Sequence, residues 1–109
     1  MIFGHEVAGE VIEVGKGVTS VVKGDLVSAE THIACGKCYL CKTDRKHICQ
    51  QTRILGVDVQ GIYSDFAILP EENAWVNDRT LDPNIAAVLE PLGNAIHTIL
   101  PENNVEDIV

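Results

Sequence analysis

Four cysteines are the residues of this chain whose spacing most directly predicts chemistry. Cys35, Cys38, Cys41 and Cys49 are its only cysteines, and they follow the pattern C-x2-C-x2-C-x7-C. Four thiolates at such short spacings can surround one Zn²⁺ tetrahedrally and leave no open coordination position. The pattern therefore predicts a structural zinc site in a lobe over residues 35–53, which has little apolar content of its own to hold it together.

Two other uses of these cysteines stay open from the spacing. They could form two disulfides, or they could hold an iron–sulfur cluster. The first residues, Met1-Ile2-Phe3-Gly4-His5, contain neither the basic nor the apolar region of a signal peptide, which disfavours an oxidising compartment. Basic residues gather around the lobe, where they would balance the charge of about −2 on a zinc tetrathiolate, although a solvated loop has the same composition. Five of the eight cationic residues of the chain are in this group: Lys37, Lys42, Arg45, Lys46 and Arg53.

A second set of potential ligands lies outside the lobe. His5 and Glu6 are adjacent, and neighbouring side chains on an extended chain point to opposite faces. They could bind one ion only if the backbone turns there, which Gly4 permits; a polar start to a strand is the alternative. Glu90, amid apolar residues, is either a buried carboxylate or a favourable charge at a helix N-terminus. His32 is either a surface residue or part of a different site.

The elements that must position these side chains are mainly strands. The sequence predicts strands over residues 7–14, 18–22 and 26–30, with glycine-containing turns between them. The segment 61–69 is apolar on both faces and predicts a well-buried strand. A short extended segment, 74–76, places Trp75 in the expected core.

Helices are expected near the C-terminus. Asp82 and Pro83 fit the N-cap and first position of a helix. Pro91 is expected to end that helix after Glu90, and a second helix is expected over 92–100. Residues 101–109 are predicted to be a connector. The fold class is thus mainly β with short helices, in one domain.

Composition narrows the possible functions. The chain has 109 residues, 46% of them hydrophobic, and a net charge of −8, which argues against nucleic-acid binding. No apolar run approaches the ~20 residues of a membrane span. A reducing, cytoplasmic setting is the default expectation. Gly15-Lys16-Gly17 lacks the third glycine of a dinucleotide-binding fingerprint, so these residues predict a turn and no NAD site.

Several segments together resemble the zinc-dependent medium-chain dehydrogenase family, whose catalytic domain is GroES-like. They are Gly4-His5-Glu6 and the valine-rich strand after it, Val22-Lys23-Gly24-Asp25-Leu26-Val27, the four-cysteine lobe, and Glu90-Pro91-Leu92-Gly93-Asn94-Ala95. Segments 29–38, 54–58, 72–75 and 90–95 are most similar to the branch that acts on threonine. The resemblance covers essentially the whole chain.

The resemblance implies a fold and a site. The fold would be a GroES-like partial β-barrel with a structural-zinc lobe and a C-terminal helix pair. His5 and Glu6 match a pair at the catalytic zinc, Glu90 matches an acidic ligand or proton-relay partner, and His32 matches a histidine near the substrate. The four cysteines match the structural zinc ligands. The family reaction would oxidise a secondary alcohol with NAD⁺, here threonine to 2-amino-3-oxobutanoate, in a homo-oligomer.

The chain also departs from the family pattern. An upstream cysteine ligand of the catalytic zinc and a dinucleotide-binding domain are both missing from its 109 residues. We therefore expect residues 1–109 to be part of a catalytic domain from a longer parent, with about one zinc per chain and no activity alone. A sorbitol or butanediol dehydrogenase relative and a non-catalytic zinc-stabilised β module are the alternatives.

Overall fold

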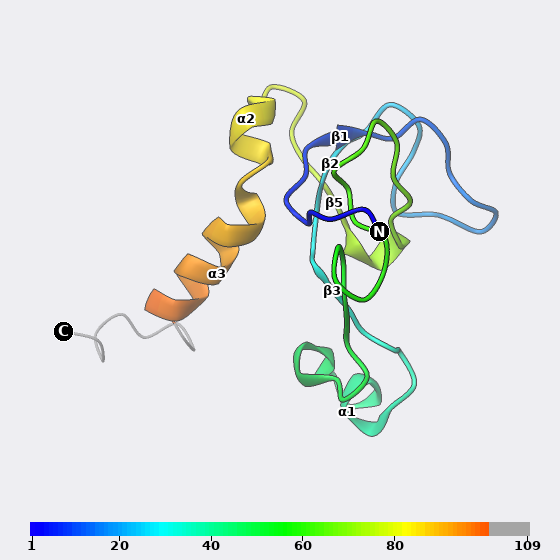
Figure 1. Cartoon of the computed structure of the whole chain (residues 1–109), viewed down its shortest axis with the longest axis vertical. Coiled ribbons are helices and arrows are strands. Elements are labelled where there is room, and N and C mark those ends of the chain that lie inside the picture. The colour runs from blue at the N-terminus through cyan, green and yellow to red at the C-terminus, as the bar shows by residue number, and fades with distance from the viewer. Residues whose placement is uncertain (101–109) are drawn as a thin grey trace.

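The computed structural model describes residues 1–100, which form two small antiparallel sheets, a cysteine lobe and a pair of helices (Figure 1). One sheet has the order β1-β2-β5 and the other pairs β3 with β4. The elements are β1 (Gly9–Glu10), β2 (Leu26–Ala29), β3 (His32–Ile33), α1 (Tyr39–Lys42), the 3-10 helix η1 (Lys46–Ile48), β4 (Arg53–Ile54), the 3-10 helix η2 (Glu71–Asn73), β5 (Ala74–Val76), α2 (Pro83–Ala86) and α3 (Leu89–Ile99). This arrangement confirms the mainly β fold class with short helices.

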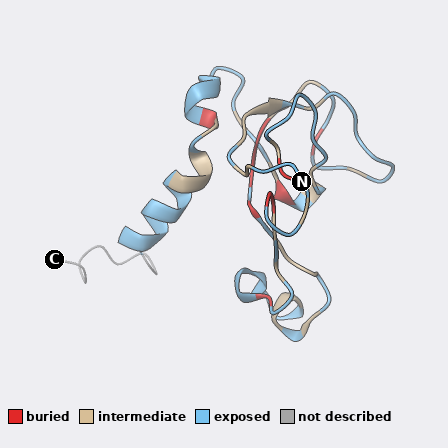
Figure 2. Ribbon diagram, in the orientation of Figure 1, coloured by how far each residue is buried: buried red, intermediate tan, exposed pale blue. Residues whose placement is uncertain are grey.

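Strand β2 forms within residues 26–30, where a strand was predicted, and it lies at the centre of the larger sheet. Val27, Ser28 and Ala29 are all buried, and Val27 pairs with Gly9 on one side and with Val76 on the other. The Ser28 hydroxyl donates to the carbonyl of Ala86 at 2.7 Å, which joins α2 to the sheet. The buried residues therefore concentrate around β2 (Figure 2).

The predicted strand over residues 61–69 is wrong. Only its first three residues have a strand-like partner: the main-chain N–H groups of 61, 62 and 63 donate to the carbonyls of residues 2, 4 and 3. Beyond them Ser64 hydrogen-bonds locally to the carbonyl of Phe66, and Tyr63, Phe66 and Ile68 are 89%, 75% and 93% exposed. Apolar residues on both faces do not make a buried strand unless a neighbouring chain satisfies the backbone.

Other predicted boundaries also change. The strand expected over 7–14 is only Gly9–Glu10, and residues 18–22 form no strand although Val21 is buried.

Strand β5 forms where an extended segment was expected. Trp75 on it is 64% exposed, so the prediction that it packs in the core is wrong. Its strand pairs on one side only within the described residues.

The C-terminal helix pair forms, with a different boundary. Asp82 caps α2 as predicted, because its carboxylate accepts the main-chain N–H of Asn84 at 2.8 Å. Pro91 does not end a helix; it is the third residue of α3, where a missing N–H costs nothing because first-turn N–H groups have no partner within the helix. The break falls instead at Val88. The connector predicted over 101–109 lies outside the described residues.

Candidate metal centres

The four cysteines come together from three different local structures. Cys35 precedes a turn, Cys38 is the N-cap residue of α1, Cys41 lies in that helix, and Cys49 is the C-cap residue of η1. All four are free thiols, and each offers a sulfur within 4.8 Å of the other three. The predicted lobe over 35–53 therefore has its ligands in one cluster.

The spacing of the sulfur atoms fits one zinc ion. Cys38 Sγ lies 3.6 Å from Cys41 Sγ and 3.8 Å from Cys49 Sγ, and Cys35 Sγ lies 3.9 Å from Cys41 Sγ. An ion at the usual Zn–S distance of about 2.3 Å in a tetrahedron needs sulfurs about 3.8 Å apart. Disulfide bonds would need sulfurs about 2.05 Å apart. The donor set and its geometry fit zinc.

Main-chain N–H groups also point at these sulfurs. Cys35 Sγ accepts from the N–H groups of Lys37 and Cys38 at 3.5 and 3.3 Å. This turn requires Gly36, whose φ of +73° lies in the left-handed region that side chains disfavour. Cys49 Sγ accepts from the N–H groups of Cys35 and Gln51, both at 3.4 Å. Such donors stabilise the thiolate form that a metal binds.

The electrostatics show why the cluster needs a cation. The main-chain N–H groups of Cys35 and Gln51 lower the pKa of Cys49 to about 6, and that of Cys41 lowers the pKa of Cys38. Burial raises the pKa of Cys41 to about 12, and the neighbouring thiols act in the same direction. Four thiols so close together cannot all ionise to thiolates without a positive charge among them. A divalent cation removes this conflict.

We expect zinc to leave this lobe in acid. The lowered pKa of Cys49 means that its ionised form stabilises the fold above the ordinary thiol value of about 8.5, and that this contribution is lost as pH falls through about 6. Protons then compete with the metal for the sulfur. Dialysis at stepped pH, with zinc measured by a colorimetric chelator, should show retention at pH 7 and release below about pH 6. Release centred above pH 7 would contradict this account.

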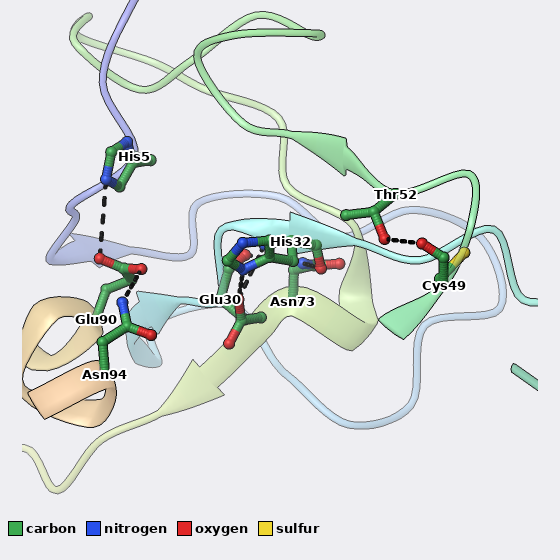
Figure 3. A network of polar contacts seen from close by, with 8 residues as sticks. All are labelled: His5, Glu30, His32, Cys49, Thr52, Asn73, Glu90 and Asn94. Carbon is green, nitrogen blue, oxygen red and sulfur yellow. Dashed lines mark hydrogen bonds and ion pairs between the residues drawn. The ribbon is translucent and has the colours of Figure 1, made fainter. Parts of the chain in front are cut away.

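A second cluster brings His5 and Glu6 to Glu90 on α3. One ligand atom from each lies within 4.8 Å of the other two. His5 Nε2 is 3.8 Å from Glu90 Oε2, and the other oxygen of Glu90 accepts a hydrogen bond from Asn94 at 2.8 Å (Figure 3). The side chain of Glu90 is only 10% exposed. A nitrogen and two carboxylates are donors that zinc accepts, and three protein ligands would leave its fourth coordination position open.

Close glycine contacts, which the sequence reasoning missed, hold the His5 segment in place. Gly4 has a φ of +92°, the turn that lets His5 and Glu6 reach one site. A Cβ atom on Gly61 would lie 2.4 Å from the carbonyl oxygens of both Gly4 and Phe3, and one on Gly56 would lie 2.6 Å from that of Gly4. Only glycine allows this approach. Isolated glycines in an apolar segment were the available signal for such a close approach of two backbones.

His32 does not join the second cluster. Among the described residues, its imidazole pairs with Glu30, whose Oε1 lies 2.8 Å from Nδ1 (Figure 3). The buried side chain of Asn73 donates to the carbonyls of Glu30 and His32 at 2.8 and 3.0 Å. Glu30 and Asn73 were not predicted as site residues. The spacing of two between Glu30 and His32, which places both on one side of an extended chain, was the available signal for Glu30.

These features define a β domain with a four-cysteine cluster and a second cluster of mixed nitrogen and oxygen donors. The family model of the alcohol dehydrogenase GroES-like domain matches residues 1–78. The chain belongs to this family. The fold and the cysteine lobe agree with that assignment, and the resemblance seen in the sequence is confirmed.

Curated relatives narrow the comparison. The L-threonine 3-dehydrogenase of Thermococcus kodakarensis is 57% identical over 99 residues, which are 91% of this chain and 28% of that enzyme. The L-threonine 3-dehydrogenase of Caldanaerobacter subterraneus is 55% identical over 96 residues, 88% of this chain and 28% of that enzyme. The chain thus spans a little over a quarter of the length of these relatives.

Solved structures share the fold. A zinc-binding dehydrogenase from Sinorhizobium meliloti, solved with NADP, aligns with a TM-score of 0.82 and 31% identity over 89% of this chain and 28% of its own. A cobalt- and zinc-bound thermostable alcohol dehydrogenase from Pyrobaculum aerophilum aligns with a TM-score of 0.72 and 38% identity over 82% of this chain and 27% of its own. The helices within residues 1–100 do not combine the length and the hydrophobicity that a transmembrane span requires.

Proposed function

We propose that this chain supplies the zinc-binding part of an NAD-dependent oxidoreductase that converts L-threonine to 2-amino-3-oxobutanoate. The observation that carries the proposal is the presence of two donor sets with different chemistry in one domain. The four sulfurs suit a closed structural site, whereas His5, Glu6 and Glu90 suit a site that leaves a position for a ligand. The names of the two curated relatives described above support threonine as the substrate.

Each residue of the second site has a role in this proposal. His5, Glu6 and Glu90 hold zinc, and Asn94 keeps the Glu90 carboxylate oriented through its hydrogen bond. Zinc bound there supplies Lewis-acid polarisation of an alcohol oxygen, and NAD⁺ supplies the hydride acceptor. His32 contacts the substrate. One oxygen of Glu90 lies toward His5 and the other accepts the hydrogen bond from Asn94, which supports its proposed role as a ligand; a proton-relay role is the alternative.

The zinc lobe has a structural role in the proposal. Its metal would hold residues 35–53 together, and only Cys49 among its cysteines is buried by the protein itself. We propose a cytoplasmic location for the protein, because four thiols at this spacing bind zinc only while they are reduced. It also includes assembly as a homo-oligomer, which the family resemblance implied.

A chimera tests the proposed reaction. The segment of the Thermococcus kodakarensis enzyme that matches this chain would be replaced by the corresponding residues of this chain, and NADH formation would be followed with L-threonine. We expect activity within about tenfold of the unmodified enzyme and, after Glu90→Ala in the chimera, a loss of about a hundredfold or more. Glu13→Ala, which removes an exposed carboxylate outside the site, is the matched control.

Two outcomes would contradict the proposal. A chimera that oxidises sorbitol or butane-2,3-diol in preference to threonine would show that the substrate is wrong. A folded, zinc-loaded chimera without activity on any of these alcohols would favour the alternative of a non-catalytic zinc-stabilised module. Zinc content and NAD binding, measured on the same preparation, establish that the chimera is folded.

A further inference from the structure

Glu30 contacts His32 at two points, its main chain and its ring. They lie two residues apart where the chain passes from β2 to β3. One oxygen of Glu30 accepts the main-chain N–H of His32 at 2.9 Å and lies 2.8 Å from its Nδ1 (Figure 3). A single carboxylate oxygen thus holds both the backbone and the ring of His32.

The ionisation state of Glu30 decides whether the proton of this hydrogen bond is on Glu30 or on Nδ1 of His32. Partial burial raises the pKa of Glu30, but the main-chain and ring N–H groups of His32 outweigh it, and the pKa lies below its usual value. Glu30 is therefore a carboxylate at neutral pH. A carboxylate has no hydrogen to donate, so Nδ1 of His32 must carry the proton that joins them. A neutral His32 ring then has a lone pair on Nε2.

The backbone beneath the pair is fixed by the core. Asn73, which is 5% exposed, donates from Nδ2 to the carbonyls of both Glu30 and His32. The N–H of Glu30 in turn donates to the Asn73 carbonyl at 2.8 Å. The N–H of Leu55, a fully buried residue, donates to the carbonyl of Thr31 between the pair. These bonds place the Glu30 carboxylate and the His32 ring on one side of a fixed backbone.

We propose that Glu30 is a positioning residue that holds His32 as its Nδ1–H tautomer and leaves Nε2 as an accessible hydrogen-bond acceptor. The side chain of His32 is 51% exposed, so a ligand can approach the ring from solvent. A group that binds neutral His32 at this atom must bring a hydrogen-bond donor, as a hydroxyl or an ammonium does. A carboxylate has only acceptors and cannot form a hydrogen bond with Nε2. The inference concerns the ring of His32 alone and does not depend on the proposed reaction.

Nitrogen NMR of the full chain, loaded with one equivalent of zinc, tests this assignment. Two-bond ¹H–¹⁵N correlation at about pH 8.5, where histidine side chains are generally neutral, distinguishes the two tautomers. We expect the Nδ1–H form of His32 to dominate by about tenfold or more, because a hydrogen bond to a charged group is strong. His5, His47 and His97 serve as internal comparisons.

Three variants separate the role of Glu30 from a merely structural one. Glu30→Ala removes the acceptor, and we expect the preference for Nδ1–H to be lost. Glu30→Gln retains a carbonyl acceptor, and we expect it to keep the tautomer of the wild type. Glu72→Ala, which removes an exposed carboxylate next to Asn73, should change nothing. A predominantly Nε2–H ring in the wild type, or an unchanged tautomer in Glu30→Ala, would overturn the proposal.

Discussion

Replacement of Cys49 by serine is expected to abolish stoichiometric zinc binding by the lobe. Cys49 is the one buried cysteine of the four, and its sulfur both lies 3.8 Å from that of Cys38 and accepts two main-chain N–H groups. Structural zinc contributes about 10–16 kcal/mol to the folding of small zinc domains. Loss of one thiolate should lower the zinc content from about one equivalent per chain to below about a tenth and disorder residues 35–53.

Elemental analysis after dialysis against a weak chelator measures this loss. Ile48→Ser is the matched control, because it places the same side chain one residue earlier, at a position that is 52% exposed and offers no sulfur ligand. We expect this control to keep its zinc. Equal zinc in Cys49→Ser and Ile48→Ser would show that the cluster is no zinc site. Two tightly held equivalents in the unmodified chain would contradict the expectation that the second site is incomplete.

Replacement of Gly61 by alanine is expected to disturb the second metal site while leaving the lobe intact. The added Cβ atom would lie 2.4 Å from the carbonyl oxygens of Phe3 and Gly4, a distance that real Cβ contacts do not show. The chain before His5 must therefore move, and the hydrogen bonds from residues 61–63 to residues 2–4 must lengthen or break. We expect a loss of about 2–3 kcal/mol in the free energy of unfolding.

Two measurements together identify the cause. Urea denaturation reports the loss of stability, and Co²⁺ titration of the zinc-loaded chain reports binding at the His5 cluster, which we expect to weaken by about tenfold or more. Gly9→Ala is the matched control, because the nearest atom to its added Cβ, beyond its chain neighbours, is 3.8 Å away. Unchanged Co²⁺ binding in Gly61→Ala would contradict the view that the glycine contacts position His5. Loss of lobe zinc in that variant would show that the two sites are not independent.

The parts of the fold that sequence predicted correctly depend on local chemistry. The helix start at Asp82 and Pro83 depends on a side chain and a fixed φ within one turn. The strand Leu26–Ala29 depends on its own composition and on glycine turns before it. The helix start held because its interactions involve residues only a few positions apart. The strand held because β1 and β5, whose residues are far away in the sequence, also supply the backbone partners that it needs.

The predictions that failed needed knowledge of distant neighbours. Residues 61–69 are apolar enough for a buried strand, yet only residues 61–63 pair with a distant segment, residues 2–4, and Phe66 and Ile68 stay exposed. Trp75 is exposed for the same reason, because no described element packs over its ring. The type of a side chain indicates how much free energy its burial would contribute. Whether it is buried depends on another part of the chain packing against it.

Sequence by itself determined the four-cysteine site, since its ligands lie within fifteen positions and closing such short loops costs little entropy. Tertiary structure alone decided that His5 and Glu6 meet Glu90 from the far end of the chain, and that Asn73 holds Glu30 and His32 across 43 and 41 positions. It also decided that Gly61 must be glycine, because only the fold brings the backbone of Gly4 against it. Those contacts depend on chain segments whose pairing no local pattern encodes.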